Sequence, residues 1–433
     1  MTDEQRLLDD LTRFVAIPSI SADPAMAIDV HRSAAVVAEA FRDVGIDATA
    51  VTAAGGLPAV VGRAEGPPGA PTVLLYAHHD VQPVGDLAAW QSDPFTLTPR
   101  DGRLFGRGTA DDKGGIAVHL ETLRALGRDL PVSVAVLIEG EEEIGSPTLA
   151  ALLAEHADLL RADLVLAPDA VNAGPLAPTL TVSLRGLLNV LVTVRTAERP
   201  VHSGIYGGAV PDALSALIRL LATMTDEHGA IAIDGLHRRT ETTGGPDASV
   251  VRAEAGMLPG VHVVGHGSMA ERLWDGPALT ITGIDAPSAA GAANALLPTA
   301  RAAISVRLAP EDDPGDVLSA LKIHLAAHAP WGVHLEVEPV AMGRGWRARS
   351  ASPYMTLAHE VLSEAFGTPA TSVGVGGAIP FVATVLDAMP EADILVTAVQ
   401  DPLTQAHAPD ESVAQATLAA ATRAETEMLR RLR

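Results

Sequence analysis

The sequence predicts an α/β fold in which a mainly parallel-sheet domain, covered by helices, is interrupted by an inserted α+β domain. Up to about residue 182, apolar strand-like runs alternate with helical patterns, which is typical of a parallel sheet between helices. From about residue 184 the order becomes β-α-β-β-α-β, which is typical of a ferredoxin-like unit. The first pattern resumes after about residue 343.

The length of the chain agrees with this division. At 433 residues it exceeds one ordinary hydrophobic core and indicates two or three domains. We therefore predict a discontinuous first domain of residues 1–183 and 343–433, and an inserted domain of residues 184–342.

The first domain is expected to begin with an amphipathic helix, because Leu7, Leu11 and Phe14 fall on one helical face. The strand at 132–138 is apolar on both faces, which indicates a central strand covered by helices. The further elements expected in this domain are helix 29–44, strand 72–76, helix 116–126, strand 164–168, helix 354–366 and strand 394–399.

The inserted domain is expected to contain four strands and two helices, with a loop rich in Gly, Thr and Asp at 240–249. In chain order these elements are strand 187–194, helix 211–224, strands 278–284 and 301–308, helix 314–327 and strand 333–337.

Composition excludes several functions. A net charge of −23 and a pI near 4.9 leave no basic face for a nucleic-acid backbone. The chain has no Cys, so a metal must be held by His and carboxylates. The acidic start does not resemble a signal peptide, and no apolar run reaches bilayer-spanning length. We therefore expect a cytoplasmic protein without a membrane partner.

Potential metal ligands follow the ends of four predicted strands. Ligands in open α/β sheets bind beyond the carboxyl ends of the strands, so these groups should lie together. They are His78-His79-Asp80, the acidic run 139–143, Asp169 and His407, and a Gly-rich turn at 106–115 contributes Asp111 and Asp112.

Each of these groups has another interpretation when taken alone. The acidic run could be the solvated start of a loop, and His407 could be an exposed histidine. A phosphate-binding loop at 106–115 is disfavoured, because it lacks the required spacing and its two Asp residues would repel phosphate. Strand alternation places His78 and Asp80 on one side and His79 on the other, so Asp80 could orient the His78 ring.

Together the motifs resemble the M20 metallopeptidases. Within that family the sequence is most similar to the cytosolic nonspecific dipeptidase and carnosinase branch, and the similarity runs nearly end to end. The motifs that carry it lie at 77–83, 106–115, 139–146, 202–208 and 407–411, together with Asp169.

The resemblance implies a dinuclear metal site, usually zinc, with manganese or cobalt as alternatives. Asp111 would bridge the two ions, His78 and Asp169 would complete one shell, and Glu143 and His407 the other. A metal-bridging water would be the nucleophile. Further roles follow for Glu142 as general base and Asp80 as the partner of His78, and the peptide between Asp111 and Asp112 is often cis in this family.

The same resemblance places two further residues in the inserted domain, which would act as a lid and dimerisation domain. His202 would reach the active site of a partner subunit and support the oxyanion, so a homodimer is implied. Arg307 would grip the terminal carboxylate of the substrate. From the residues alone, His202 could equally be a loop histidine and Arg307 an exposed strand arginine.

Two parts of the sequence give conflicting indications of the substrate class. Asp169, rather than Glu, is typical of the family's aminopeptidases and dipeptidases. Val375 and Ala378 stand where the dipeptidases usually have Glu and Ser.

We therefore predict a zinc dipeptidase or aminopeptidase-like enzyme that acts on dipeptides or short peptides. An N-acyl or N-carbamoyl amino-acid amidohydrolase with the same centre is the alternative. A non-catalytic metal-dependent binding protein ranks below both, because a binding protein has no use for Glu142.

Overall fold

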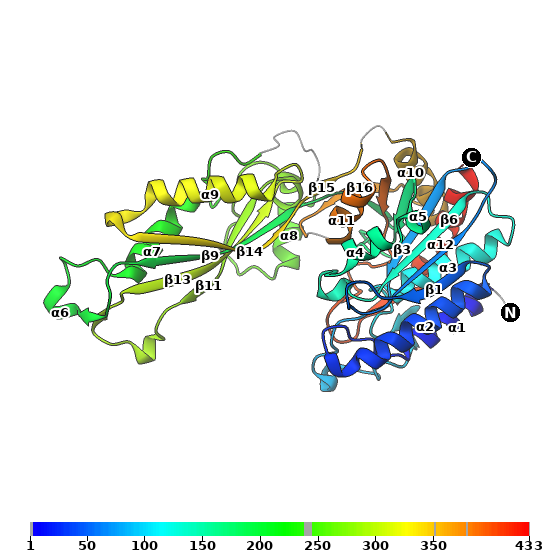
Figure 1. Ribbon diagram of the computed structural model, residues 1–433, viewed down its shortest axis with the longest axis horizontal. Helices are drawn as coiled ribbons and strands as arrows, with labels where there is room; N and C mark the ends of the chain where they lie inside the picture. The colour runs from blue at the N-terminus through cyan, green and yellow to red at the C-terminus, as the bar shows by residue number, and fades with distance from the viewer. Residues whose placement is uncertain (1–2, 238–244, 350–351, 378–379, 433) are drawn as a thin grey trace. The chain divides into compact units, whose positions relative to one another are not determined.

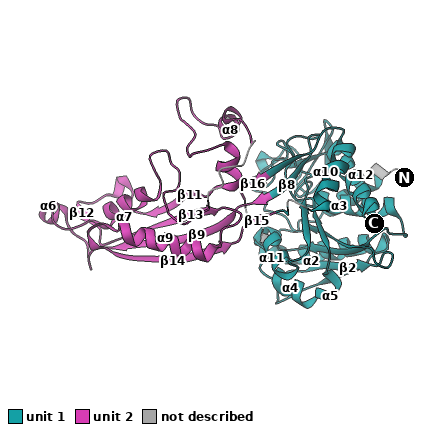
Figure 2. Ribbon diagram, turned by 90° about the horizontal axis from the view of Figure 1, so that it is seen from above, with its two compact units in different colours: residues 1–182, 348–373, 380–433 teal, residues 183–347, 374–379 magenta. Residues whose placement is uncertain are grey.

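The structure is a computed structural model of the chain, and it describes residues 3–237, 245–349, 352–377 and 380–432. The chain divides into two compact units, which Figure 2 colours separately. Unit 1 comprises Met1–Val182, Ala348–Val373 and Pro380–Arg433, and unit 2 comprises Ser183–Arg347 and Gly374–Ile379.

Residues 374–377 pack with unit 2, whereas the sequence placed them in the first domain. The glycines of this segment allow a very close approach to other residues of unit 2. A Cβ atom on Gly374 would lie 2.4 Å from Trp274 Cβ, and one on Gly376 would lie 2.6 Å from Arg185 Nη2. This packing has no signature in hydrophobic periodicity, so the sequence did not reveal it.

Unit 1 is built on a sheet with the strand order β1-β2-β6-β3-β7-β17-β8. Figure 1 labels β1, β3 and β6 of this sheet. The four strands β6, β3, β7 and β17 run parallel, as the sequence predicts, and antiparallel strands flank them. The strands are β1 (Asp47–Val51), β2 (Ala59–Ala64), β3 (Thr72–His78), β6 (Ser133–Glu139), β7 (Leu164–Ala167), β8 (Thr179–Leu184) and β17 (Asp393–Val396). A smaller sheet contains β4 (Thr98–Arg100), β5 (Arg103–Phe105) and β18 (Ser412–Ala414).

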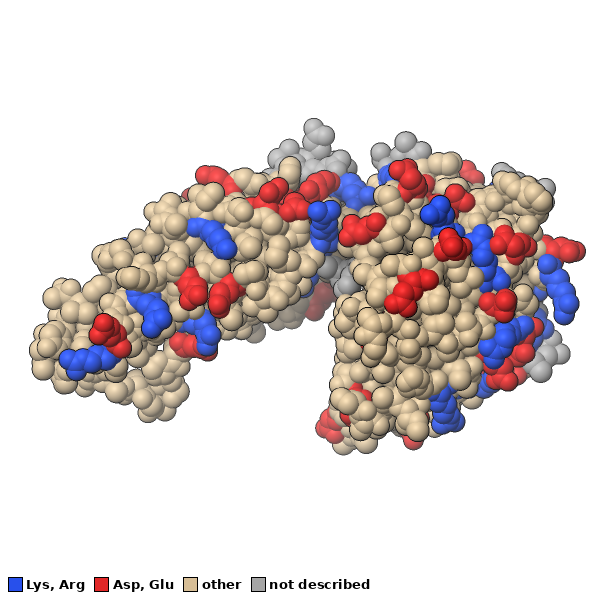
Figure 3. Space-filling model, viewed as in Figure 1, with Lys and Arg blue, Asp and Glu red and all other residues tan. Residues whose placement is uncertain are grey.

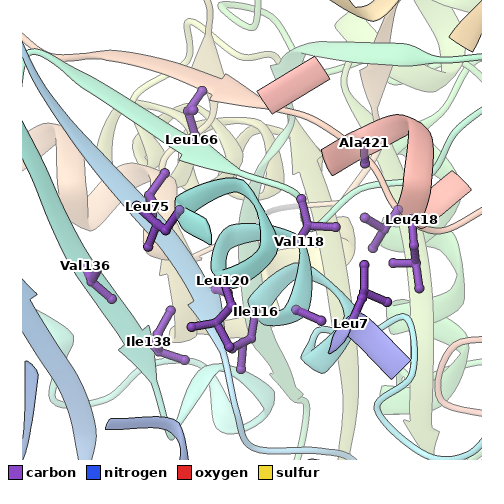
Figure 4. Packing of buried hydrophobic residues seen from close by; sticks show 14 of the residues in the cluster. Leu7, Leu75, Ile116, Val118, Leu120, Val136, Ile138, Leu166, Leu418 and Ala421 are labelled. Carbon is purple, nitrogen blue, oxygen red and sulfur yellow. The ribbon is translucent and has the colours of Figure 1, made fainter. Parts of the chain in front are cut away.

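Helices cover both faces of the central strands. Leu75 of β3 belongs to the same buried core as Ile116 and Leu120 of α3 (Figure 4). The neighbouring Tyr76 points to the other face, where its ring stacks on Phe381 of α11 with centroids 3.8 Å apart. The helices of unit 1 are α1 (Asp3–Val15), α2 (Ala27–Asp43), α3 (Lys113–Leu126), α4 (Leu149–Glu155), α5 (Ala157–Leu160), α10 (Pro353–Phe366), α11 (Pro380–Ala388) and α12 (Gln415–Arg431).

The start of α3 joins the Gly-rich turn to the N-terminal helix. The buried Lys113 Nζ donates hydrogen bonds to the carbonyls of Phe14, in the last turn of α1, and Ile17, just beyond that helix, at 2.9 and 2.8 Å. The next residue, Gly114, has no room for a side chain, because a Cβ atom there would lie 2.4 Å from the Thr109 carbonyl oxygen. This lysine therefore caps a helix whose last carbonyls need donors.

Unit 2 contains a four-stranded antiparallel sheet with the order β11-β13-β9-β14. Side chains of β9 alternate between buried and half-buried, and the buried set shares a core with α7 and α9. The strands are β9 (Gly186–Arg195), β10 (Val201–His202), β11 (Ala278–Asp285), β12 (Ala295–Leu296), β13 (Thr299–Leu308), β14 (His334–Gly343) and β15 (Trp346–Arg347), and β16 (Thr371–Val375) lies at the boundary of the units. The helices are α6 (Ser203–Tyr206), α7 (Ala213–Leu221), α8 (Ala248–Glu254) and α9 (Pro314–His328).

The predicted loop at 240–249 is only partly tested. Residues 240–244 lie outside the described residues, and 245–247 have no regular structure. The prediction is wrong for the last two positions, because α8 begins at Ala248. Asp247 precedes that helix at its N-cap, a position that Asp favours.

In the part of the chain that the structure describes, no helix is both long and apolar enough to cross a bilayer. On the face shown in Figure 3, Lys and Arg are interspersed with Asp and Glu rather than gathered together.

Candidate metal centre

The parallel strands of unit 1 bring predicted ligands to one edge of the sheet. β3 ends in His78, which pairs in register with Glu139 at the end of β6. β7 leads to Asp169 two residues later, and β17 leads into the loop that carries His407. Parallel neighbours end at the same edge, so residues far apart in sequence converge there.

All five predicted metal ligands come together in two groups that share Asp111. Ligand atoms of His78, Asp111 and Asp169 lie within 4.8 Å of one another, and Asp111, Glu143 and His407 form a second such group. His78 Nε2 is 3.0 Å from Asp111 Oδ1, and His407 Nε2 is 2.9 Å from Asp111 Oδ2. His407 Nε2 is also 3.2 Å from Glu143 Oε2. Asp111 thus presents one carboxylate oxygen to each group.

These donors fit two divalent cations. Each group combines one imidazole nitrogen with two carboxylates, a donor set that suits zinc and related transition-metal ions. A carboxylate shared by two adjacent groups is the geometry required of a bridging ligand. The peptide bond between Asp111 and Asp112 is cis, as the family resemblance implies.

The pKa values of the ligands reflect concentrated negative charge. Burial, with Asp111 close by, raises the pKa of Asp169 well above its usual value. Burial opposes protonation of His78, but hydrogen bonds to Asp111 and Asp80 raise its pKa well above the ordinary one. Hydrogen bonds to Asp111 and then to Glu143 raise the pKa of His407 to about 10. Such a cluster would be stabilised by bound cations.

Asp80 positions two segments of the site. Its Oδ1 lies 3.4 Å from His78 Nδ1, and its own carbonyl oxygen is 3.0 Å from the same nitrogen. Its carboxylate also accepts hydrogen bonds from the backbone N–H groups of Glu142 and Glu143, at 3.3 and 3.1 Å. His79 is directed elsewhere, where its ring bonds to a backbone carbonyl of another loop.

Glu142 lies beside the ligands without belonging to either group. It begins a short 3₁₀ turn, Glu142–Ile144, and is half-buried. Burial raises its pKa to about 7; His78 opposes this shift, and the carboxylates of Glu143 and Asp111 add to it. A carboxyl group that titrates near neutrality is suited to accept and return a proton.

The other two glutamates of the acidic run have structural partners. Glu141 Oε1 accepts a hydrogen bond from the Leu57 N–H at 2.8 Å, and its other oxygen accepts one from the Thr148 hydroxyl. The hydroxyl of Tyr76 donates to Glu139 Oε2 at 2.9 Å, and burial raises the pKa of Glu139 to about 8. The sequence placed these two residues in the motif without assigning either a chemical role.

His202 and Arg307 belong to unit 2. His202 is exposed at the start of α6, where its Nδ1 accepts a hydrogen bond from the Gly204 N–H at 3.1 Å. Arg307 is half-buried on β13, and its side chain makes no hydrogen bond or ion pair with any described residue. The carbonyl of Val375 accepts a hydrogen bond from the Arg185 N–H at 3.2 Å, and Ala378 lies outside the described residues.

Three polar residues near the ligands were not predicted from the sequence. Gln82 donates from Nε2 to Glu143 Oε2 at 2.9 Å, and Arg107 is paired with Glu411 at 2.7 Å. All three residues lie inside the motifs at 77–83, 106–115 and 407–411, and this was the one sign of their importance in the sequence. Each contacts a residue more than fifty positions away, so sequence spacing could not predict these contacts.

The chain is similar in sequence to a known peptidase family and to curated dipeptidases. The model of peptidase family M20/M25/M40 matches residues 74–431. The cysteinylglycine-S-conjugate dipeptidase of Corynebacterium striatum is 34% identical over 437 residues, covering 99% of this chain and 95% of the relative. The beta-Ala-His dipeptidase of Rattus norvegicus is 27% identical over 414 residues, covering 87% of this chain and 83% of the relative.

Among solved structures, the M20 family metallo-carboxypeptidase Sso-CP2 from Sulfolobus solfataricus has the same fold. Its TM-score is 0.80 at 24% sequence identity, with 100% of this chain and 99% of that chain covered.

Proposed function

The chain belongs to peptidase family M20/M25/M40, and on that premise we propose that it hydrolyses the peptide bond of dipeptides with two divalent metal ions. Membership confirms the metallopeptidase resemblance seen in the sequence. The observation that carries the proposal is the pair of ligand groups that share Asp111. The named activities of both reported sequence relatives, which are dipeptidases, favour this substrate class.

We assign the ligands by the group in which each lies. His78 and Asp169 would hold one ion, Glu143 and His407 the other, and Asp111 both. Zinc is the proposed metal, with manganese or cobalt as substitutes that accept the same donors. Two such ions, when bound, activate water and polarise the scissile carbonyl.

Glu142 is the proposed general base. It would accept a proton from the attacking water and return it to the leaving amine. The hydrogen bond from its backbone N–H to Asp80 holds the turn from which its side chain extends. Because Asp80 also contacts His78, one buried carboxylate would set the relative positions of a ligand and the base.

Two residues of unit 2 are proposed to act on the substrate. Arg307 has no acidic partner among the described residues, and a guanidinium fork matches the terminal carboxylate of a dipeptide. The exposed His202 is proposed to stabilise the oxyanion in the site of a partner subunit, which requires a homodimer. We also propose a cytoplasmic location and assign unit 2 as the lid and dimerisation domain.

A substrate panel tests this function. Protein loaded separately with zinc, manganese and cobalt is assayed against Cys-Gly, β-Ala-His and other dipeptides, and against N-acyl and N-carbamoyl amino acids. Metal-dependent release of amino acids from dipeptides is expected. Turnover confined to the N-acyl or N-carbamoyl compounds would replace dipeptidase with amidohydrolase. Stable metal binding without cleavage of any amide would contradict both the dipeptidase and the amidohydrolase activity.

A further inference from the structure

The buried carboxylate of Glu411 makes four hydrogen bonds, and all four donors lie in the turn that carries Asp111. Oε1 accepts from the backbone N–H groups of Ala110 and Asp111, at 3.0 and 3.2 Å. Oε2 accepts from the Gly108 N–H at 3.0 Å and from Arg107 Nη1 at 2.7 Å. Glu411 is therefore bonded to the backbone of the shared ligand itself.

Arg107 extends this connection to two other segments of the centre. Only 1% of its side chain is exposed, and its Nη1 pairs with Glu411. Its Nη2 donates to the carbonyls of Pro83 and Ala408, at 3.2 and 3.4 Å. Ala408 directly follows the ligand His407, and Pro83 lies in the segment that follows β3. One buried ion pair thus joins three ligand-bearing segments of unit 1.

The loop that carries His407 needs such anchoring. Gln405, His407 and Asp410 are not glycines, yet their φ angles are 55°, 63° and 61°. Residues with side chains rarely adopt this conformation, and they keep it only where surrounding contacts fix it. Asp410 is held by both the backbone and the side-chain amide of Gln91, at 3.0 and 2.7 Å. Glu411 fixes the adjacent position against the Asp111 turn.

An ionised carboxylate at Glu411 can accept all four hydrogen bonds from the Asp111 turn. Each of its oxygens receives two donors, so a carboxylate with four acceptor positions is fully used. Burying that charge is tolerable because Arg107 pairs with it. An amide of the same shape would offer a single acceptor oxygen and would turn its own N–H donors toward two of the existing donors. With both oxygens occupied, Glu411 is not available as a metal ligand.

We propose that Glu411 is a positioning residue, which fixes Asp111 and, through Arg107, the His407 loop in the geometry that binds the two cations. The inference rests on the proposed function, because it assumes that the two ligand groups hold metal. It assigns to Glu411 a contribution to metal affinity that is separate from any contact with substrate. Outer partners of metal ligands typically change affinity by about 10–100-fold when removed.

The test is Glu411→Gln in the full chain, with metal affinity measured directly. Metal-free protein is titrated with Zn²⁺ by calorimetry, and with Co²⁺ while its visible absorption spectrum is recorded. Wild type should bind two ions. The variant should bind them about 10–100-fold more weakly, with a cobalt spectrum that reports altered coordination.

Glu121→Gln is the matched control. Glu121 is a buried carboxylate of α3 paired with Arg6 and Arg124, at 2.9 and 3.1 Å, and neither arginine lies in a ligand-bearing segment. Its replacement should lower thermal stability but leave both metal affinities unchanged. An equal loss of metal affinity in this control would show that general destabilisation, rather than positioning, explains the result.

A second variant covers failure of Glu411→Gln to fold. Arg107→Lys keeps the positive charge but replaces the two guanidinium nitrogens, one bonded to Glu411 and the other to the Pro83 and Ala408 carbonyls, by a single nitrogen on a shorter side chain. It should therefore also weaken metal binding. Two ions bound with wild-type affinity in the folded Glu411 or Arg107 variant would overturn the positioning role alone. Failure of the wild-type protein to bind two ions would overturn the proposed function as well.

Discussion

Strands β6 and β9 are both central in their sheets, yet they are buried differently. Every residue of β6 is buried, because helices cover both faces of the unit 1 sheet. In β9, buried and half-buried residues alternate, because α7 and α9 share a core with only one set of its side chains. Among the described residues, both ligand groups belong to unit 1.

The difference indicates where each kind of chemistry can be built. A strand buried on both faces delivers its last residues to a desolvated edge, where carboxylates must be paired or bind cations. A sheet with one accessible face can present polar side chains such as Arg307 without that cost. We therefore expect substitutions of the unit 1 ligands to change metal content, and substitution of Arg307 in unit 2 to change substrate affinity at unchanged metal content.

The largest effect is expected from Asp111→Ala. Both ligand groups lose their shared carboxylate, so neither ion should remain bound after dialysis. Turnover should lose most of its rate enhancement, which for enzymes is at least about 10⁶-fold. Elemental analysis of the purified variant gives metal content, and a dipeptide assay gives activity. Two retained ions would contradict the sharing of Asp111.

Glu142→Gln should separate chemistry from metal binding. The variant keeps the shape of the side chain but cannot act as a base, so kcat should fall by about 10²–10⁴-fold. Metal content should stay at the wild-type level, whereas Glu143→Ala should lower it. If Glu142→Gln remains active, another residue takes the proton.

Arg307→Ala should show the contrasting behaviour of unit 2. Loss of a charged hydrogen bond to the substrate should cost about 1.5–3 kcal/mol, or roughly 10–150-fold in kcat/KM, mainly through KM. Arg301→Ala is the control, because Arg301 lies on the same strand and pairs with Asp285 at 3.0 Å. Altered metal content in the Arg307 variant would break the proposed division between the units.

The smallest effect is expected in the pH dependence of the free energy of unfolding, which we compare for two histidine–carboxylate pairs. In unit 1, burial opposes protonation of His119, but Glu425 raises its pKa above the ordinary 6.5. The folded state therefore holds the proton more tightly, and the resulting stability is complete below pH 6.5 and disappears as pH rises through the folded-state pKa. His119→Gln should lower the free energy of unfolding by on the order of 1 kcal/mol in acid, with a smaller difference at high pH.

The matched variant for that measurement is His266→Gln in unit 2. His266 pairs with Asp226 at 2.7 Å, but more than half of its side chain is exposed. Solvent screens such a pair, so chemical unfolding across the same pH range should show little change. Equal pH dependence in the two variants would mean that burial does not distinguish these pairs.

Most of the sequence-predicted elements agree with the structure, and the differences have physical causes. Helix 354–366 corresponds to Pro353–Phe366, because its apolar residues have a clear helical period. The strand expected at 394–399 ends earlier, at Val396, where the chain leaves the sheet toward the loop of His407. No element was predicted at 415–431, although α12 lies there.

The sequence by itself determined the family and the α/β class, and the family resemblance named the five ligands that the structure brings together. The residues alone placed His, Asp and Glu side chains after apolar strands, which indicated that they reach one edge of the sheet. Only the tertiary structure gave partners to the glutamates of the acidic run that had no assigned role. Glu141 bonds to Leu57 and Thr148, whereas Glu143 faces His407.

Only the folded chain revealed the ion pair of Arg107 and Glu411, whose partners are separated by 304 residues. Local patterns report burial and secondary structure, because both depend on near neighbours in the sequence. Hydrogen bonds between loops depend instead on which segments the core brings together. That is why the ligands could be predicted from the sequence, while the buried charges that position them could not.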